Sequence, residues 1–385
     1  MRSRKRMFSR SLFFFFIAAS ARAEAPASAI AAALQPFVDK HELAGAVTLV
    51  ATKDKVLDVA TVGWADVAAK KPMQADAMFW IASMSKAMTA AGLMVLVDEG
   101  KVKLDDPVEK YLPEFKGQMV IAEKDEAHTL LKKPVHPITV RNVLSHTSGL
   151  PFKSPIEEPT LDMIPLVTAV KSHAMSALMF EPDSKYQYSN AGINTAGRII
   201  EVVSGMSYED FLQKRLFEPL GMKDTTFWPN DEQVSRLAKS YKPNAAKTDL
   251  EETTVTQLHY PLQDRRRQPM PGGGLFATAA DVAAFCQLLM NNGMHQDQRV
   301  LSEAAVKEMT RRQTAPELKE SYGFGLQAGP GNFGHGGAYS TNMTVDVEHG
   351  LITVFMVQHA GFPGNGKESG GKFKAAALKA FGSGR

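Results

Sequence analysis

Short apolar segments near both ends of the chain predict strands, whereas the middle of the chain shows apolar residues at helical spacing. Residues 45–52 and 55–66 predict a hairpin with a two-residue turn. Three segments near the C-terminus, at 321–327, 338–348 and 350–358, predict consecutive strands. The strands of one sheet are therefore expected to come from both ends of the chain.

Longer segments carry the periodicity of amphipathic or buried helices. These segments are residues 28–40, 83–99, 108–112, 140–150, 162–179, 192–204, 207–217, 279–291 and 372–381. The helix that begins near Ser83 is apolar on nearly every side between Ala87 and Val97, which is typical of a helix inside the core. Gly100 is expected to end it.

Together these patterns predict an α/β architecture. Residues 24–82 and 300–385 are expected to form an antiparallel sheet domain with helices packed against it. Residues 83–299 are expected to form a mainly helical domain inserted between the two halves, with the helix of Ser83 at the interface. A site is expected in the cleft between the two parts.

The first 23 residues predict a signal peptide. A basic segment precedes an apolar core of about ten residues, which is shorter than the roughly 20 that a membrane span needs, and Ala21-Arg22-Ala23 matches a cleavage site. The alternative is an uncleaved membrane anchor. We expect a secreted or periplasmic protein with no stable membrane span after cleavage.

Removing this leader changes the charge of the chain. The 385 residues carry a formal charge of +3, and residues 1–23 hold six basic side chains and no acidic one, so cleavage leaves −3. A slightly acidic chain gives no reason to expect nucleic acid as a partner. The one cysteine, Cys286, lies in an apolar helical segment and is expected to be a buried, inert thiol.

Ser83 and Lys86 are the first candidates for chemistry. They lie three residues apart, on one face of the first turn of the buried helix. The free N–H groups and the dipole of that turn favour developing negative charge, and an ammonium group removed from water has a lowered pKa and can act as a base. Alternatively, Ser83 is an N-cap residue and Lys86 is a solvated lysine.

Tyr188 and Asn190 form the second candidate motif. In an extended segment, residues two apart face the same way, so both side chains are expected to point into one cleft, with Ser189 pointing away. A phenol near a lysine is expected to have a lowered pKa and to move a proton. The alternative is a buried tyrosine followed by an asparagine that caps a helix.

The third candidate motif is His335-Gly336-Gly337-Ala338. Two glycines let a substrate approach the backbone closely at a strand edge. A backbone N–H of this motif, with that of Ser83, could bind an oxyanion. His335 could donate a hydrogen bond to the substrate or to Tyr188, although an isolated histidine in a glycine-rich loop is often without function.

In their order along the chain, these three motifs resemble the superfamily of serine β-lactamases and penicillin-binding proteins. The resemblance is strongest to its class C-like branch, which includes class C β-lactamases, family VIII carboxylesterases and D-amino-acid peptidases. It covers roughly residues 30–380, with further similar segments in ITVRNVLSHTSGLP, FEPLGMKDTTF, GGGLFATAADVAAF and FGHGGAY.

The resemblance implies a β-lactamase-like fold and a serine hydrolase that forms an acyl-enzyme. It implies that Ser83 is the nucleophile, that Lys86 and Tyr188 are the general base and acid, and that Asn190 contacts either the substrate or the hydrogen-bond network of the site. The N–H groups of Ser83 and Ala338 are implied to form the oxyanion hole. Neither a cofactor nor a metal is implied, and the substrate is expected to be a small ester, lactam or D-peptide.

Two departures from the family pattern bear on the substrate. Many β-lactamases have a lysine where this chain has His335, and a neutral histidine would bind a β-lactam carboxylate less well. We therefore expect hydrolysis of short acyl esters, with β-lactam and D-amino-acid peptide hydrolysis as alternatives. The second departure is Asp183, where the branch usually has glycine, and it is expected to alter a turn.

Two other classes of function fit the sequence less well. Residues 366–372 match the G-x-x-x-x-G-K of a phosphate-binding loop, but Phe373 replaces the expected Ser or Thr. A non-catalytic peptidoglycan-binding protein of the same fold is a further alternative. The histidines are scattered without a metal-ligand pattern, and His146 is expected to be structural. Arg265-Arg266-Arg267 is expected to be a solvated loop, and the alternative is a place at the rim of the cleft.

Overall fold

The computed structural model describes residues 28–160 and 162–382. The predicted signal peptide, residues 1–23, lies outside the described residues. No helix in the described ranges is both long enough and apolar enough to cross a bilayer.

One seven-stranded sheet, which is antiparallel throughout, forms the centre of the fold. Its strands, in spatial order, are β12 (Gln327–Gly329), β13 (Asn332–Gly336), β14 (Asn342–Asp346), β15 (Leu351–Met356), β1 (Gly45–Ala51), β2 (Val56–Asp66) and β3 (Lys71–Pro72). The first and last parts of the chain meet where β1 pairs with β15, from Val47 opposite Met356 to Ala51 opposite Ile352. The expected sheet built from both chain ends is therefore confirmed.

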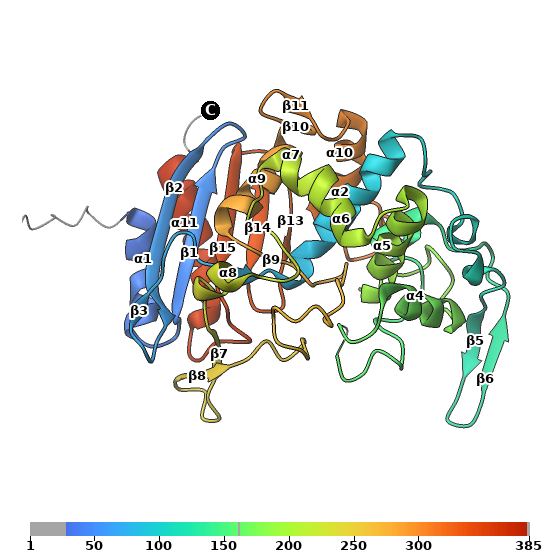
Figure 1. Ribbon diagram of the computed structural model, residues 1–385, viewed down its shortest axis with the longest axis horizontal. Helices are drawn as coiled ribbons and strands as arrows, with labels where there is room; N and C mark the ends of the chain where they lie inside the picture. Colours follow the sequence, from blue (N-terminus) through green and yellow to red (C-terminus); the bar gives the residue numbers. More distant parts are fainter. Residues whose placement is uncertain (1–27, 161, 383–385) are drawn as a thin grey trace, which may run out of the picture.

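Two terminal helices, α1 (Ala29–Asp39) and α11 (Ser369–Phe381), pack on one face of this sheet and against each other. In Figure 1 the blue N-terminal and red C-terminal elements lie together at one side of the molecule. The contact is apolar, because Ile30 and Phe373 are buried in the same hydrophobic cluster as Phe355 of β15. Burial of these side chains stabilises the outer layer.

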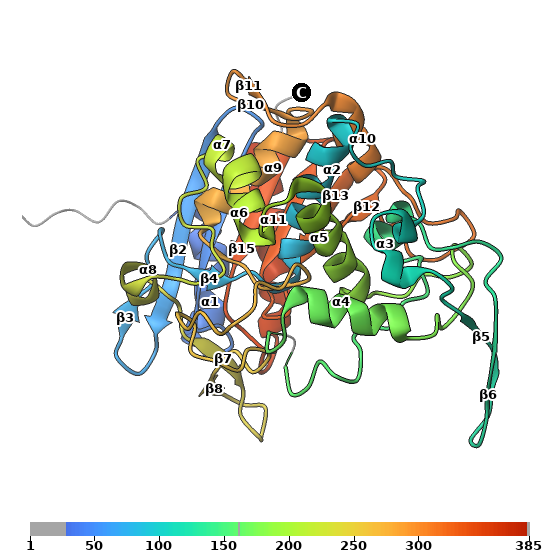
Figure 2. The same cartoon turned by 45° about the vertical axis from the view of Figure 1, so that its right-hand side comes forward.

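Helix α9 (Ala279–Met290) packs on the sheet through contacts with β1, β14 and β15. It lies within residues 83–299, the range predicted to form the helical insertion. Most of the other helices of that range gather beside the sheet (Figures 1 and 2). They are α2 (Ser85–Asp98), α3 (Val140–Ser145), α4 (Leu166–Met175), α5 (Asn190–Ser204), α6 (Tyr208–Leu212) and α7 (Glu218–Leu220), with α10 (Glu303–Thr310) following α9. Helix α8 (Asp231–Ser235) instead lies near β3, where Lys71 donates to the Ser235 carbonyl.

Helix α2 is the central helix of the fold. Every residue from Ser85 to Leu96 is buried, as the apolar pattern predicted. The helix contacts α5, α6 and α10. Because it is enclosed on all sides, a polar residue on its first turn is held away from bulk water.

Several predicted elements differ from the structure. The helix predicted at 140–150 ends at Ser145, where His146 adopts φ +62, and the short helix predicted at 108–112 is a 3-10 turn at Val108–Lys110. Residues 321–327 do not form a strand of that length, because Gly325 adopts φ +67 and turns the chain; the strands there are the shorter β12 and β13. The helix predicted at 162–179 spans Leu166–Met175, since Pro165 precedes its first residue. The helix predicted at 207–217 changes from α6 to a π-helical turn at Gln213–Phe217.

The phosphate-loop interpretation of residues 366–372 is wrong. Residues Gly366–Glu368 form a 3-10 turn and α11 begins at Ser369, so the second glycine and the lysine of the pattern lie inside a helix. A phosphate-binding loop needs these residues in an open loop around the anion.

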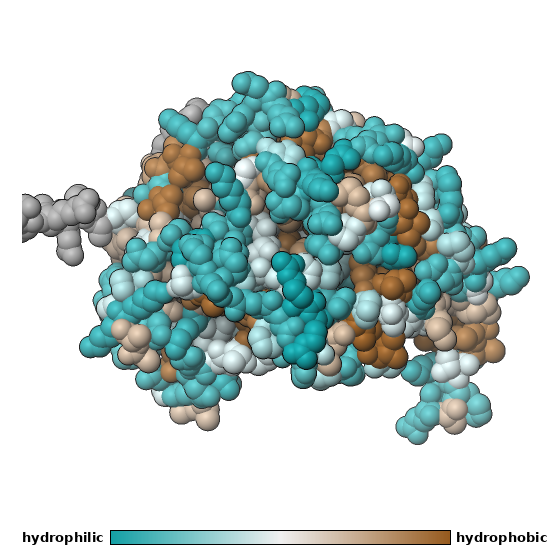
Figure 3. Space-filling model, viewed as in Figure 1, coloured by the Kyte–Doolittle hydropathy of each residue, from teal (hydrophilic) through white to brown (hydrophobic). Residues whose placement is uncertain are grey.

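Two small hairpins extend from the main body. These are β5 (Val120–Lys124) with β6 (Thr129–Lys132), and β7 (Ser240–Pro243) with β8 (Leu250–Thr253). The first projects from the helical part in Figures 1 and 2. Two more pairs of short antiparallel strands are present in the described residues. They are β4 (Phe79–Trp80) with β9 (Phe276–Ala277) and β10 (Met294–His295) with β11 (Gln298–Arg299). Polar residues cover most of the face shown in Figure 3, where apolar residues form separate areas.

Candidate functional site

A cleft of about 350 Å³ brings the three predicted motifs together. Its lining residues come from the segment before α2, the loop after α3, the start of α5, the loop before β9 and the end of β13. They are Trp80, Ala82, Ser83, Phe152, Tyr188, Asn190, Gln257, Met270, Gly272, Gly273, Gly336, Gly337 and Ala338. No side chain among them carries a charge at neutral pH.

Ser83 lies in a 3-10 turn, Ala82–Met84, that leads directly into α2. It is half-buried and its side chain reaches the cleft. The residue before it, Ala82, adopts φ +45, a conformation that residues other than glycine rarely take. Strain of this kind is found at functional positions, where the surrounding structure holds it.

Lys86 is completely buried on the first turn of α2. Its Nζ lies 3.1 Å from Ser83 Oγ and donates a hydrogen bond to the Gly272 carbonyl. Burial lowers the pKa of Lys86 to about 7, because the charged form loses its hydration. The amine is therefore held in contact with the serine and is largely neutral just above neutral pH.

Gly272 and Asn194 support this lysine, and the sequence analysis did not identify either of them. Asn194 Oδ1 accepts the Gly272 N–H at 3.0 Å, which fixes the Gly272 carbonyl that faces Lys86. A Cβ atom on Gly272 would lie 2.8 Å from Asn190 Oδ1, so a side chain there would displace the Asn190 amide from its place in the cleft. The Pro-Gly-Gly-Gly run at 271–274 was the available signal for this close approach.

Tyr188 faces Lys86 across the cleft. Its ring centroid lies 4.7 Å from Lys86 Nζ, and its hydroxyl lies 3.4 Å from His335 Nε2. Burial raises the pKa of Tyr188 to about 12, although hydrogen bonding to Ser83 acts in the opposite direction. The expectation that the lysine would lower this pKa is wrong, because the loss of hydration outweighs any charge effect.

Helix α5 begins immediately after Tyr188, and its cap is Ser189. The Ser189 side chain accepts the Gly192 N–H at 3.0 Å and donates to the Pro151 carbonyl at 2.6 Å, so it points away from the cleft. Asn190 is the first residue of the helix, is 6% exposed and lines the cleft. Tyr188 and Asn190 therefore both reach the cleft, as expected, although Asn190 belongs to the helix and not to an extended segment.

His335 lies behind the cleft and does not line it. It is 7% exposed, and burial lowers its pKa to about 4, with a smaller contribution from Lys86. Its Nδ1 is 2.6 Å from the Gly336 carbonyl, which can only accept, so Nδ1 carries the hydrogen and Nε2 is an acceptor. The expectation that His335 donates to Tyr188 or to a substrate is thus wrong.

The end of β13 packs tightly against the chain before Ser83. A Cβ atom on Gly337 would lie 2.1 Å from Thr341 Oγ1 and 2.6 Å from the Ile81 carbonyl oxygen, so only glycine fits there. Gly336 has ordinary spacing, with its nearest neighbours at 3.5 Å. The Gly337 N–H donates to the Thr341 carbonyl, which folds the next residue, Ala338, toward the cleft.

Three aromatic rings pack around the Tyr188 side chain, those of His146, Phe152 and His335. The His146 ring lies 4.6 Å from that of Tyr188 and 4.7 Å from that of Tyr322, and its Nδ1 accepts the Ser189 N–H at 3.1 Å. His146 is buried and occupies the left-handed C-cap of α3, with φ +62. These contacts support the backbone and ring of Tyr188, in line with the structural role expected for His146.

Asp183 adopts φ +66, the conformation that a glycine at this position would take without strain. Its Oδ1 accepts hydrogen bonds from Asn142 Nδ2 at 2.6 Å and from Thr147 Oγ1 at 3.2 Å. These bonds hold the turn that leads toward Tyr188. The departure from the family pattern is therefore accommodated locally, outside the cleft.

Cys286 and Arg267 lie outside the cleft and have roles in packing. Cys286 is buried in α9, and burial raises the pKa of its thiol to about 12, as expected of an inert cysteine. Arg267 is also buried, contrary to the solvated loop that was expected: its guanidinium donates to the carbonyls of Phe227 and Leu262. Arg266 is exposed and pairs with Asp264.

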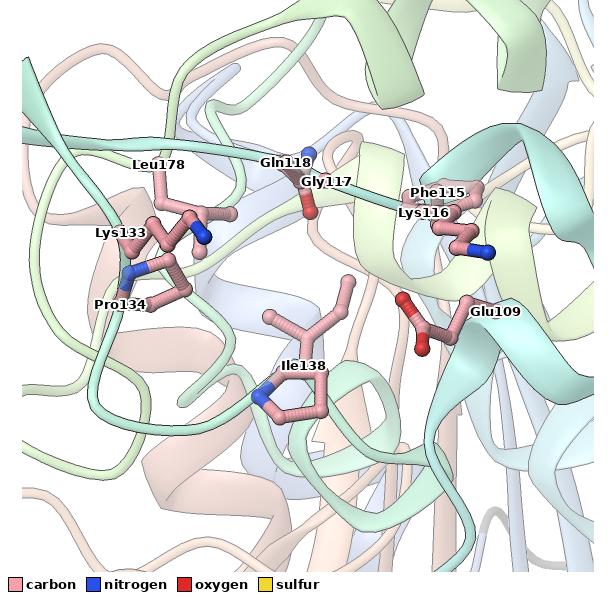
Figure 4. Close-up of a pocket in the computed structure, with 10 residues that line it drawn as sticks. Glu109, Phe115, Lys116, Gly117, Gln118, Lys133, Pro134, Ile138 and Leu178 are labelled. Atoms are coloured by element: carbon pink, nitrogen blue, oxygen red, sulfur yellow. The ribbon is translucent and has the colours of Figure 1, made fainter.

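A second cavity, of about 320 Å³, lies beside the β5–β6 hairpin (Figure 4). Apolar Ile138 and Leu178 line it together with the charged Glu109, Lys116 and Lys133. It shares no lining residue with the cleft, and no serine, threonine or cysteine lines it, so it holds no hydroxyl or thiol that could replace Ser83.

Comparisons with known proteins agree with this geometry. A family model described as Beta-lactamase matches residues 30–376. Protein Rv1367c of Mycobacterium tuberculosis is 30% identical over 370 residues, which cover 85% of this chain and 89% of that protein. Lovastatin esterase of Penicillium rubens is 29% identical over 276 residues, which cover 69% of this chain and 67% of that protein.

A solved structure gives the same architecture. EstCE1, described as a hydrolase with promiscuous acyltransferase activity, is similar with a TM-score of 0.76 at 24% identity, covering 91% of this chain and 97% of that chain. The β-lactamase-like α/β fold expected from the sequence is confirmed.

Proposed function

This chain belongs to the β-lactamase family of serine hydrolases, and we propose that it is a carboxylesterase that hydrolyses neutral esters of short acyl chains through an acyl-enzyme on Ser83. Membership of this family gives the class of reaction. The residues that line the cleft support the choice of an ester and the role proposed for each residue.

The absence of charge in the cleft is the observation that carries the choice of substrate. Among the lining residues that the structure describes, Trp80, Phe152 and Met270 are apolar, and Asn190 and Gln257 are polar but neutral. A β-lactam or a peptide ending in D-alanine carries a carboxylate, which is costly to bury without a cationic partner. A neutral ester avoids that cost.

Lys86 is assigned the role of general base in acylation. Its amine is 3.1 Å from Ser83 Oγ, and one of its hydrogens is directed at the Gly272 carbonyl. With a pKa of about 7, the amine has a free electron pair at mildly alkaline pH and can take the serine proton as Oγ attacks the ester carbonyl.

Tyr188 is assigned the role of general acid. A phenol whose pKa is about 12 remains protonated at any physiological pH, so it is a proton donor and not a phenolate base. It gives its proton to the alcohol oxygen as the tetrahedral intermediate collapses. Two neighbouring groups with pKa values held far apart are thus suited to opposite roles.

The tetrahedral oxyanion is assigned to the backbone N–H groups of Ser83 and Ala338. Both residues line the cleft, and Ser83 lies just before the positive end of α2. A water molecule then attacks the acyl-enzyme. The Tyr188 oxygen, which lost its proton in acylation, takes one from this water, and the Lys86 ammonium returns a proton to Ser83 Oγ as it leaves, which restores both groups.

The test of this function is a panel of three substrates: p-nitrophenyl butyrate, nitrocefin and a peptide ending in D-alanyl-D-alanine. Wild type is compared with Ser83→Ala. We expect the ester to be hydrolysed fastest, and we expect the variant to lose turnover of all three while keeping its melting temperature. Faster hydrolysis of nitrocefin or of the peptide would contradict the choice of ester, and retained turnover in Ser83→Ala would contradict the nucleophile.

We also propose that the protein is exported from the cytoplasm with cleavage of its leader. This proposal is supported by the basic residues, the short apolar core and the Ala21-Arg22-Ala23 site in residues 1–23. The expected mature protein begins near Glu24, which N-terminal sequencing of the exported protein would detect. Recovery of the whole protein with Met1 retained would contradict this assignment.

A further inference from the structure

Tyr322 is a buried phenol directly behind the cleft. It is 2% exposed, and its hydroxyl lies 3.0 Å from His335 Nε2. Its ring packs against those of His146 and Tyr186, at 4.7 and 5.5 Å. It does not line the cleft, so it does not touch a substrate there.

His335 Nε2 can accept a well-formed hydrogen bond from only one phenol. Its Nδ1–H is directed at the Gly336 carbonyl, so Nε2 presents a single acceptor lone pair. Two hydroxyls compete for that lone pair, Tyr322 at 3.0 Å and Tyr188 at 3.4 Å. Burial also raises the pKa of Tyr322 well above its usual value, so that its hydroxyl remains a donor.

We propose that Tyr322 is a positioning residue that occupies the acceptor nitrogen of His335 and thereby leaves the proton of Tyr188 free to face Ser83 and the leaving group. A phenol has one proton to donate. When the closer hydroxyl of Tyr322 satisfies His335, the Tyr188 proton is available to the cleft. This inference rests on the proposed role of Tyr188 as the general acid of ester hydrolysis.

Removing the Tyr322 hydroxyl is expected to make Tyr188 the donor to His335 Nε2. In Tyr322→Phe the ring contacts remain, but His335 Nε2 is left as a buried acceptor without a partner. Leaving such a group unpaired is costly, so it recruits the second hydroxyl that the described residues place beside it, that of Tyr188 at 3.4 Å. The Tyr188 proton is then directed away from the leaving group.

The leaving group of the substrate makes this effect measurable. p-Nitrophenolate is a weak base that departs without protonation, whereas ethoxide is a strong base that needs a proton from the general acid. We expect Tyr322→Phe to lower kcat/KM for ethyl butyrate about tenfold, since general acid catalysis contributes roughly 10²–10⁴-fold and is only partly lost. The value for p-nitrophenyl butyrate is expected to change less than about twofold.

A second substitution separates positioning from damage to the fold. Replacing His335 by leucine in the Tyr322→Phe background removes the competing acceptor, so the Tyr188 proton returns to the cleft. We expect this double variant to recover most of the rate lost with ethyl butyrate. Tyr241→Phe is the matched control, because its buried hydroxyl accepts the Val67 N–H far from the cleft, and it is expected to leave the ratio of the two rates unchanged.

The outcomes are distinct. Loss confined to the alkyl ester, with recovery in the double variant, supports the inference. Equal loss on both esters, no loss, or no recovery overturns it while leaving the proposed function intact. If the wild type hydrolyses neither ester, the proposed function fails and this inference fails with it.

Discussion

At the scale of single residues, the site depends on Lys86 and Tyr188. Burial lowers the pKa of the amine and raises the pKa of the phenol. Burial removes hydration from the ammonium of Lys86 and from the phenolate of Tyr188, and in each case it favours the neutral form. The result is an amine that can accept a proton beside a phenol that can donate one.

The pH dependence of kcat/KM for p-nitrophenyl butyrate tests this arrangement. Lys86 must be neutral to act as a base, so activity is expected to be low below a pKa of about 7, to rise through that value and to level off above it. No fall on the alkaline side is expected before the fold is lost, because p-nitrophenolate departs without a proton from Tyr188. Full activity two units below the Lys86 pKa would contradict the assignment.

The same burial costs stability. Below about pH 7 both the folded and the unfolded chain hold the proton of Lys86, and the buried ammonium is fully destabilising. Between that pH and the ordinary value of 10.5 only the unfolded chain holds it, so stability rises with pH across this window. Replacing Lys86 by methionine is therefore expected to raise the melting temperature by a few degrees, more at about pH 6 than at about pH 9.5.

Thermal unfolding of wild type and Lys86→Met at these two pH values measures that difference. A lower melting temperature for the variant at the acidic pH would show that the hydrogen bonds of Lys86 outweigh its desolvation.

Sequence reasoning reached Ser83, Lys86 and Tyr188 because each belongs to a short motif whose order along the chain carries information. It missed Gly272 and Tyr322 because their roles arise from contacts between segments distant in sequence, with Lys86 in one case and His335 in the other. The direction of the Tyr188 pKa shift was also missed. A sequence shows that a lysine is near, but it does not show how far both groups are removed from water.

At the scale of elements, the end of β13 must lie against the turn that carries Ser83. Gly337 is the point of contact, since a Cβ atom there would meet the Ile81 carbonyl at 2.6 Å. Gly337→Ala is expected to push the two elements apart, to move the Ala338 N–H and to lower kcat for p-nitrophenyl butyrate about 100-fold, comparable to the loss of one oxyanion donor.

Gly336→Ala is the matched variant, because a Cβ atom there meets only ordinary contacts at 3.5 Å or more. It is expected to have a much smaller effect on kcat. Equal losses in both variants would mean that the close approach at Gly337 does not position the donor.

Element types were predictable where one pattern dominated. The all-round apolar character of α2 and the capped, apolar α9 gave helices with bounds close to those observed. Prediction failed where glycines decided the path, as at Gly325, whose left-handed φ breaks the strand expected at 321–327. Asn190 was predicted to lie in an extended segment. In the structure Ser189 caps α5, so Asn190 is the first residue of the helix.

At the scale of the whole molecule, the two ends of the chain build the sheet together, and the layer formed by α1 and α11 covers one face of it. The antiparallel sheet could be expected because strand patterns occur at both ends. The predicted domain boundaries at residues 82 and 299 remain a prediction. The packing of α9 on the sheet has no signal in its own sequence.

Phe373 tests the contribution of that outer layer. It is fully buried in α11 and stacks on Phe355 with a centroid distance of 5.8 Å. Phe373→Ala is expected to lower the free energy of unfolding by about 3–5 kcal/mol in urea titrations, with kcat/KM of the folded fraction unchanged. Leu378→Ala on the same helix is the control, because Leu378 is 41% exposed and its loss should cost less than about 1 kcal/mol.

The most direct test of the account is to trap the covalent intermediate. Wild type is mixed with p-nitrophenyl butyrate, quenched in acid within the burst of p-nitrophenol release, digested and analysed by mass spectrometry. The account predicts one butyryl group on the peptide that contains Ser83 and none in Ser83→Ala. Turnover that continues while Ser83 stays unmodified, or a butyryl group on another residue, would contradict it.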